Sequence, residues 1–400
     1  MKERLARRAV DIKQSSIRAV TRRIEAVKGV NLGQGSCELE PDKSVCDAAC
    51  GAIRDGHNSY ALFDGIPQLK DAILERCREY NRLPIGRENI LVMQGATGGL
   101  ECICKAFLEV GDEVILFEPS YEYHKRSVIE RGAVPKFVTL KAPDWSFSVE
   151  ELSAAFSAKT KLMIFANPNN PTGKVFTAPE LQQIGEECRK HRAIAVADEV
   201  YEYILGPGQQ HISLAALPGL FDHAITISSA SKTLFVTGWR VGWLIAPAEV
   251  IGPLGVKSDE TYVCAPSPLQ YGVARGLRLG NDFFAGIREN FNSKRLQLEL
   301  ALRACGLVPL SPQGAYYILA DYSALGFADD DSANDALIDK VGVAAVPGNS
   351  FYSDSGVRRR TGLLRFCFAV TEQKLSRACE LLTSARLTSR YETPVRLGSS

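Results

Sequence analysis

The strongest constraint on the fold of this chain is a series of short apolar runs separated by longer amphipathic segments. The runs cover residues 89–93, 113–117, 161–166, 193–197 and 224–227. Each is rich in Val, Ile, Leu or Ala and is short, which is typical of a buried strand, whereas the segments between them have helical patterns. Buried strands that alternate with helices form a mainly parallel sheet covered on both faces. We therefore predict an α/β fold with a largely parallel sheet.

Polar or small residues follow the end of each predicted strand. They are Gly95, Ala96 and Thr97, then Tyr121, Asn170, Asp198 with Tyr201, and Ser229 with Lys232. In open parallel sheets, ligands bind outside the carboxyl ends of the strands. We therefore expect these residues to line one site.

The most informative of these clusters is the run Ser-Ser-Ala-Ser-Lys-Thr at residues 228–233. A hydrated ammonium at the end of a core strand is tolerated when its charge is lost or used, and an imine formed by Lys232 with an aldehyde does this. Ser229, Ser231 and Arg240 add two hydroxyls and a guanidinium, which suit a phosphorylated aldehyde. Taken alone, the run equally fits a Ser/Lys surface loop.

Residues 94–99 form a second candidate phosphate site. They are a glycine-rich turn between a predicted strand and a predicted helix, and such a helix N-terminus presents backbone N–H groups to an anion. The spacing of the glycines is that of neither named nucleotide-binding loop.

Four further side chains would have a chemical role in the same site. Asp198 would pair with a protonated pyridine nitrogen, Tyr201 and Asn170 carry donors for a phenolate oxygen on that ring, and Tyr121 offers a face for stacking. Each also has an ordinary structural interpretation: a helix cap for Asp198, core packing for Tyr201 and a turn for Asn170.

The pattern changes after residue 286, where a long charged helix leads into strands at residues 313–320 and 363–368 of a smaller α+β domain. Arg365 interrupts an otherwise apolar strand, so it either binds a carboxylate or forms a structural ion pair. We place a large domain at residues 37–285 and a small domain at residues 1–36 and 286–400.

Charge and cysteine content exclude several classes of protein. The 47 Lys and Arg residues are balanced by 46 Asp and Glu, which argues against nucleic-acid or membrane-surface binding. The eleven cysteines are scattered through apolar stretches, as expected for a reduced, cytoplasmic protein, and Cys46 with Cys50 lacks the second ligand pair of a zinc site. We predict no membrane span, no signal peptide and no metal.

Taken in order and spacing, these motifs resemble those of the fold-type I, pyridoxal-phosphate-dependent aminotransferases of classes I and II, from about residue 17 to 382. The resemblance is nearest to the kynurenine aminotransferase and glutamine transaminase K branch. The motifs that carry it are residues 31–35, 167–173, 198–201, 211–219, 229–233, 237–243 and 364–366. It implies a seven-stranded type of sheet sandwiched by helices, a smaller α+β domain, and pyridoxal 5'-phosphate as the cofactor.

The resemblance also implies a role for each site residue. Lys232 would be the Schiff-base lysine and proton shuttle, Asp198 would bind the ring nitrogen, and Tyr201 and Asn170 would bind the ring oxygen, with Tyr121 stacked on the ring. The cofactor phosphate would be held by Ala96, Thr97, Ser229 and Arg240, and by Tyr60 of a second subunit. Gly95 and Ser231 would also bind the cofactor. Arg365, Asn170 and the Gly35 backbone would grip the substrate α-carboxylate.

These roles imply a cytoplasmic homodimer of amino-acid metabolism that moves an amino group from an L-amino acid to a 2-oxo acid in two half-reactions. The family often has a Pro-Asp-Phe run after its second glycine, whereas residues 36–39 here are Ser-Cys-Glu-Leu. With Phe63, Tyr123, Tyr262 and Leu39 nearby, we expect neutral or aromatic donors. The alternatives are β-elimination from a cysteine conjugate by the same cofactor and, from another class, a non-catalytic sensor.

Overall fold

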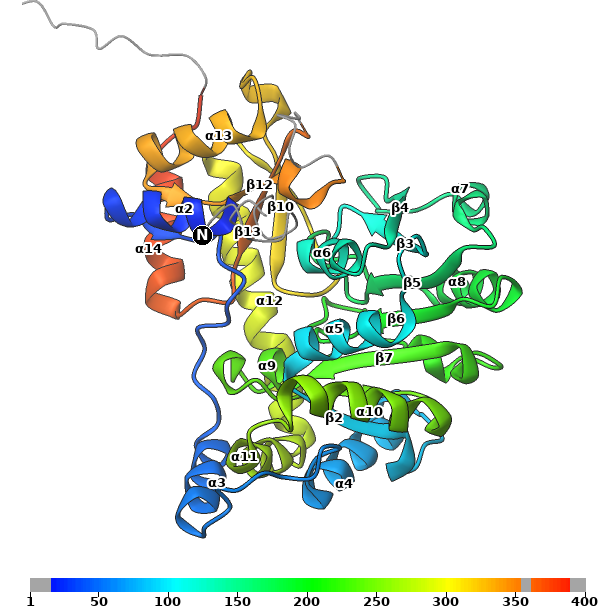
Figure 1. Ribbon diagram of the computed structural model, residues 1–400. Helices are drawn as coiled ribbons and strands as arrows, with labels where there is room; N and C mark the ends of the chain where they lie inside the picture. Colours follow the sequence, from blue (N-terminus) through cyan, green and yellow to red (C-terminus); the bar gives the residue numbers. More distant parts are fainter. Residues whose placement is uncertain (1–15, 354–360, 389–400) are drawn as a thin grey trace, which may run out of the picture. The chain divides into compact units, whose positions relative to one another are not determined.

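The computed structural model describes residues 16–353 and 361–388, and the chain divides into two compact units (Figure 1). The first unit contains residues 36–293 and 312–317. The second contains the described parts of residues 13–35, 294–311 and 318–400.

The first unit is built on a seven-stranded sheet with the strand order β2-β8-β7-β6-β5-β3-β4. The strands are β2 (Ile90–Met93), β3 (Glu113–Glu118), β4 (Val134–Thr139), β5 (Thr160–Ala166), β6 (Ile194–Asp198), β7 (Ala224–Ser229) and β8 (Gly242–Ile245). Strand β8 runs antiparallel to β2 and β7, and the pairs among the other strands are parallel. The predicted α/β fold with a mostly parallel sheet is confirmed.

Helices cover both faces of this sheet (Figure 1). They are α3 (Lys43–Arg54), α4 (Pro67–Arg76), α5 (Gly95–Phe107), α6 (Glu122–Glu130), α7 (Val149–Ala155), α8 (Ala178–Lys190), α9 (Ala230–Thr233), α10 (Ala248–Tyr262) and α11 (Ser267–Leu277).

Side chains of β7 alternate between the two faces of the sheet, and each face packs against different helices. Ile225 and Ile227 belong to the hydrophobic core that includes α5 and α10, whereas Thr226 and Ser228 line a cavity with Ile73 of α4. Because successive strand residues point to opposite faces, β7 presents apolar side chains to the layer of α5 and α10 and polar side chains to the layer of α4.

The second unit combines short strands with helices, as predicted for the smaller α+β part. Its four-stranded sheet has the order β12-β13-β10-β9, and β1 pairs with β11 in parallel. These strands are β1 (Val30–Asn31), β9 (Val308–Leu310), β10 (Tyr317–Asp321), β11 (Val343–Ala344), β12 (Val346–Pro347) and β13 (Leu363–Cys367). Its helices are α2 (Ser16–Ala26), α13 (Asp330–Ala336), α14 (Glu372–Ser384) and the carboxyl-terminal part of α12 (Asn281–Ala304).

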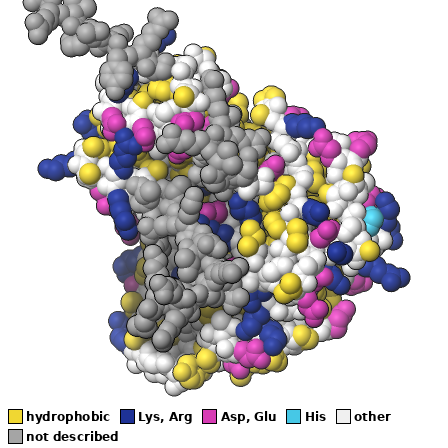
Figure 2. Space-filling model, turned by 45° about the horizontal axis from the view of Figure 1, so that its top comes forward, with side chains coloured by type: hydrophobic (Ala, Val, Ile, Leu, Met, Phe, Trp, Pro, Cys, Tyr) yellow, Lys and Arg dark blue, Asp and Glu magenta, His cyan; other side chains and the backbone are white. Residues whose placement is uncertain are grey.

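The surface agrees with the balanced composition. Figure 2 shows Lys and Arg side chains interspersed with Asp and Glu on the visible face. Within residues 16–353 and 361–388, no helix has the length and apolar character needed to cross a bilayer.

Candidate active site

The predicted site residues of the first unit follow neighbouring strands of the large sheet. Ala166 of β5 pairs with Asp198 of β6, and Asp198 pairs with Ile227 of β7. Ser229, at the end of β7, pairs with Gly242 of β8. The carboxyl ends of β5, β6 and β7 therefore lie side by side, with Asn170, Tyr201 and Lys232 in the segments that follow them.

Arg240 lies against the N-terminus of helix α5. A Cβ atom added to Gly95 would lie 2.6 Å from Arg240 Nη2, so a larger residue there would push the guanidinium away from the helix. Gly95 has a φ of +70°, which also favours glycine. The Arg240 Nη1 atom donates to the Thr237 carbonyl at 2.9 Å, which fixes the guanidinium beside the helix. Ala96 is half-buried and Thr97 is exposed on the same first turn.

The hydroxyl of Ser229 lies in the adjoining turn. Its Oγ accepts from the Ser231 N–H at 3.0 Å and lies 3.1 Å from the Val241 carbonyl and 2.9 Å from Ser231 Oγ. These contacts, together with the guanidinium of Arg240 and the helix N-terminus, form a cradle suited to a phosphate group.

Gly242 allows the two halves of this cradle to meet. A Cβ atom at Gly242 would lie 2.8 Å from the Gly95 carbonyl carbon and from the Ser228 oxygen, and 2.9 Å from the Ala96 nitrogen. All three are backbone atoms, so they cannot move aside as a flexible side chain would. The close approach of β8 to the start of α5 therefore requires glycine at this position.

We expect Gly242→Ala to lower the thermal stability and the cofactor affinity together. Overpacking of a tight site costs about 1–3 kcal/mol, and relief of this clash would displace the α5 N-terminus. Thermal unfolding of the apoprotein and equilibrium dialysis with pyridoxal phosphate measure the two effects. Gly238→Ala is the matched control, because a Cβ at Gly238 meets nothing within 4 Å. Equal thermal stability and equal cofactor affinity in the two variants would contradict the requirement for glycine at position 242.

Asp198 is held by a histidine that the sequence analysis did not identify. His124 Nε2 donates to Asp198 Oδ2 at 3.2 Å, and the histidine is only 2% exposed. The Tyr121 ring meets the His124 ring edge to face, with centroids 5.6 Å apart. The available signal was the position of His124 in the first turn of α6, three residues after Tyr121, because this turn carries both rings into the same site.

Tyr201 and Asn170 are buried, at 4% exposure each. Burial raises the pKa of Tyr201 well above its ordinary value, so its phenol stays protonated and can donate a hydrogen bond. The Asn170–Pro171 and Asn167–Pro168 peptide bonds are both cis, the rarer state of an X–Pro bond.

Lys232 lies in the short helix α9 and is half-buried. Its Nζ atom lies 5.5 Å from the centre of the Tyr316 ring. That ring in turn meets Tyr201 edge to face at 5.1 Å. The lysine therefore shares an aromatic wall with the phenol proposed to bind the ring oxygen.

The remaining predicted residues lie elsewhere in the chain. Tyr60, in the loop before α4, is 82% exposed. Arg365 and Gly35 belong to the second unit, where Arg365 is 2% exposed on β13. Its Nη2 donates to the Gly33 carbonyl at 3.0 Å, and its guanidinium lies 4.7 Å from the Phe351 ring centre.

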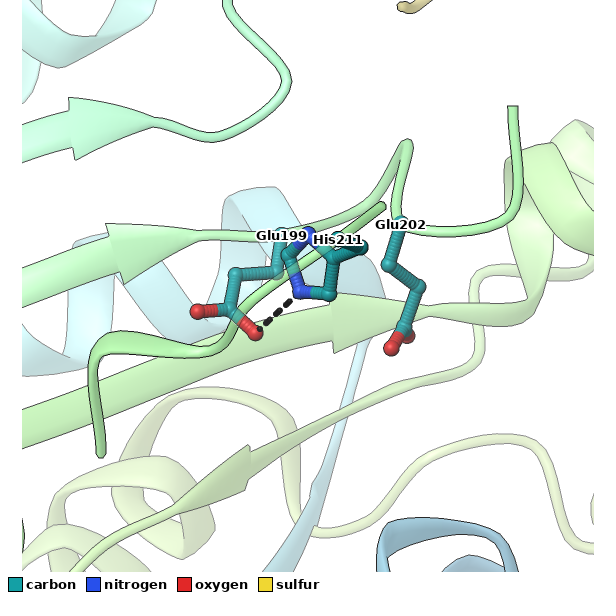
Figure 3. Close-up of side chains that lie close together, drawn as sticks. All are labelled: Glu199, Glu202 and His211. Atoms are coloured by element: carbon teal, nitrogen blue, oxygen red, sulfur yellow. Dashed lines mark hydrogen bonds and ion pairs between the residues drawn. The ribbon is translucent and has the colours of Figure 1, made fainter. Parts of the chain in front are cut away.

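A second buried polar cluster lies beside the proposed site, formed by Glu199, Glu202 and His211 (Figure 3). His211 Nε2 donates to Glu199 Oε2 at 3.1 Å, whereas Glu202 accepts from the Ser228 hydroxyl at 2.7 Å and from Asn81 Nδ2 at 2.8 Å. These bonds tie the turn after β6 to β7 and to the chain after α4.

Two groups of this cluster bind protons more tightly in the folded protein. Burial raises the pKa of Glu202 above 4.5. Burial alone would lower the pKa of His211, but the Glu199 carboxylate outweighs it and raises this pKa above 6.5. The folded state therefore holds more protons than the unfolded state above pH 4.5, so the free energy of unfolding falls as the pH rises.

We expect Glu202→Gln to reduce this pH dependence. The variant lacks the buried carboxyl, so its Tm should rise relative to the Tm of the wild type as the pH increases from about 5 to 8. Each kcal/mol of difference in the free energy of unfolding should appear as a difference of roughly 2–4 °C in Tm. Thermal unfolding across that range measures the difference. Glu249→Gln, which changes an exposed glutamate of α10, should show a constant difference. A constant difference for Glu202→Gln as well would refute the expectation.

The family model for aminotransferase class I and II matches residues 27–382. The chain therefore belongs to the class I and II aminotransferases, a family of transferases whose members use pyridoxal 5'-phosphate. This match confirms the family resemblance seen in the sequence. It also confirms the aminotransferase activity and the cofactor that the resemblance implies.

Relatives with named activities lie in the branch that the sequence indicated. The chain is 34% identical over 390 residues to kynurenine–oxoglutarate transaminase of Dictyostelium discoideum, covering 87% of this chain and 89% of that protein. It is 35% identical over 383 residues to kynurenine–oxoglutarate transaminase 3 of Mus musculus, covering 88% and 84%. A solved Escherichia coli structure, identified as a methionine aminotransferase, matches with a TM-score of 0.90 and 28% identity over 95% of this chain and 99% of that chain.

The residues of the first unit fit this cofactor. A dianionic phosphate suits the guanidinium of Arg240 and the N-terminus of α5, which lie so close together that a Cβ at Gly95 would be 2.6 Å from Arg240 Nη2. Asp198 supplies a buried carboxylate for a protonated ring nitrogen, and Tyr201 supplies a neutral phenol for the ring oxygen.

Proposed function

We propose that the protein moves an amino group from a neutral or aromatic L-amino acid to a 2-oxo acid, with Lys232 as the acid–base residue. The observation that carries this proposal is the alignment of β5, β6 and β7, which puts Asp198 and the segment containing Lys232 at one edge of the sheet. The Arg240 guanidinium beside Gly95 adds an anion site at the N-terminus of the adjoining helix.

Pyridoxal phosphate, when bound, supplies an aldehyde and a ring that accepts electrons from the substrate α-carbon. Asp198, oriented by His124, would hold the ring nitrogen in its protonated form. Tyr201 and Asn170 would donate to the ring oxygen, and Tyr121 would stack on the ring. Lys232 Nζ would take the substrate α-proton and return it, because a lysine amine acts as a base when neutral and as an acid when charged.

The substrate α-carboxylate is assigned to Arg365, with Asn170 and the Gly35 backbone. The contacts of Arg365 with the Gly33 carbonyl and the Phe351 ring hold its planar fork in one orientation, which suits bidentate binding of a carboxylate. The preference for neutral or aromatic donors is supported by the aromatic residues Phe63, Tyr123 and Tyr262, and by relatives named for kynurenine.

We propose that the protein forms a homodimer and that it is cytoplasmic. Tyr60, Leu62 and Phe63 expose 82%, 64% and 42% of their surface in one loop, and large apolar side chains grouped in this way are typical of an interface. Tyr60 would then reach the phosphate of the partner's cofactor. The eleven cysteines are all free, as in proteins of reducing compartments.

A donor-by-acceptor screen with the purified enzyme tests the proposed function. Neutral, aromatic and acidic L-amino acids are paired with several 2-oxo acids, and product formation is followed for each pair. We expect turnover to require an acceptor and to be fastest with neutral or aromatic donors. Ammonia release at the full rate without an acceptor would instead identify an elimination enzyme, and a clear preference for aspartate would overturn the proposed substrate class.

A further inference from the structure

Residues 312–317 form a short segment that is fixed against the loops of the proposed site. The Val175 N–H donates to Gln313 Oε1 at 3.0 Å, and the Gly314 N–H donates to the Gly173 carbonyl at 2.8 Å. The Ala315 N–H donates to the Ile204 carbonyl at 2.9 Å. The segment is therefore tied to the chain after both β5 and β6, and it delivers Tyr316 and Tyr317 to fixed positions.

Tyr317 brings a second phenol to Tyr201. The two hydroxyl oxygens lie 3.1 Å apart, and the rings meet nearly at right angles with centroids 6.0 Å apart. Tyr317 is 2% exposed and Tyr201 is 4% exposed, so bulk water does not compete for this hydrogen bond.

A phenol carries a single hydrogen, which decides the direction of the bond. If Tyr201 gives its hydrogen to the cofactor ring oxygen, as proposed above, it has none left for Tyr317. The hydrogen between the two oxygens must then come from Tyr317. Tyr201 accepts this bond while it donates to the ring, and hydrogen bonds arranged in such a chain strengthen one another.

We propose that Tyr317 is a positioning residue that donates to Tyr201 and thereby aims the Tyr201 hydrogen at the ring oxygen of the cofactor. This inference rests on the role proposed for Tyr201. Tyr317 does not touch the reacting atoms in this arrangement, and it acts only through the phenol of Tyr201. Its loss should therefore weaken a donor to the ring oxygen without removing the cofactor.

Tyr317→Phe tests the inference, because it removes one hydroxyl and leaves the ring. The primary readout is the pH midpoint at which the visible absorption band of the cofactor-loaded protein changes. A weaker donor leaves more negative charge on the ring oxygen, which holds the proton at the neighbouring Lys232 nitrogen more tightly. We expect the midpoint to rise by roughly 0.5–1 pH unit, with turnover lower by about 5-fold.

Two more variants separate the inference from the proposed function. Tyr201→Phe should raise the midpoint further than Tyr317→Phe does. The double variant should match Tyr201→Phe, because Tyr317 acts through that phenol. Tyr203→Phe is the matched control: Tyr203 is equally buried, but its hydroxyl accepts from Arg76 Nε at 3.4 Å, so its loss should leave the midpoint unchanged.

Each result has one meaning. A shift with Tyr201→Phe and none with Tyr317→Phe overturns the inference and leaves the proposed function intact. No shift with Tyr201→Phe overturns the proposed role of Tyr201 itself. Shifts that add in the double variant show that Tyr317 acts independently, which also overturns the inference.

Discussion

Lys232→Ala should abolish amino transfer, with turnover lower by at least about 10⁴-fold for every donor and acceptor. The variant loses the only amine assigned to the substrate α-proton, and the segment that carries it follows the end of β7 beside Asp198. Steady-state rates, with single-turnover absorbance to detect residual chemistry, measure the loss.

Two control variants show whether the amine or only its charge matters. Lys232→Arg keeps a cation at the position, but a guanidinium does not deprotonate at the working pH, so this variant should be as inactive as Lys232→Ala. Lys141→Ala changes a lysine whose side chain is 56% exposed, and it should behave as the wild type does. Substantial turnover by either Lys232 variant would remove this residue from the mechanism.

The strands of the large sheet were predictable where both of their faces are buried. β5, β6 and β7 are almost fully buried, so each reads as a continuous apolar run. β4 lies at the sheet edge, where Val134, Lys136 and Phe137 are at most partly buried, and its sequence lacks such a run. β4 is therefore not predictable as a strand from hydrophobic patterning.

The buried apolar runs also explain which site residues could be predicted from the sequence. Asp198 and Ser229 stand directly after apolar runs, and parallel strands bring such positions to one edge of the sheet. His124 and Tyr317 reach the site through packing instead. His124 lies 74 residues before Asp198, and Tyr317 lies 116 residues after Tyr201. The spacing of Tyr121 and His124 indicates only that the two rings share a turn. No local pattern predicts contacts over such separations, because they depend on how α6 and residues 312–317 pack against the sheet.

Asp198→Asn should lower turnover by about 100- to 1000-fold and weaken cofactor affinity. Asparagine has the shape of aspartate, and its carbonyl can still accept from His124 Nε2, so the fold should persist. What is lost is the negative charge opposite the protonated ring nitrogen, and removing one partner of a buried ion pair costs about 3–5 kcal/mol. Initial rates and equilibrium dialysis with pyridoxal phosphate measure the two effects.

Asp222→Asn is the matched control for this prediction, because it makes the same substitution at an exposed position before β7. It should leave both the rate and the cofactor affinity unchanged. The His124→Gln variant should fall between the control and Asp198→Asn, since the carboxylate keeps its charge and loses only the donor that orients it. If Asp198→Asn stayed within 10-fold of the wild type, the ring nitrogen would not need this carboxylate, and another group would have to supply the opposing charge.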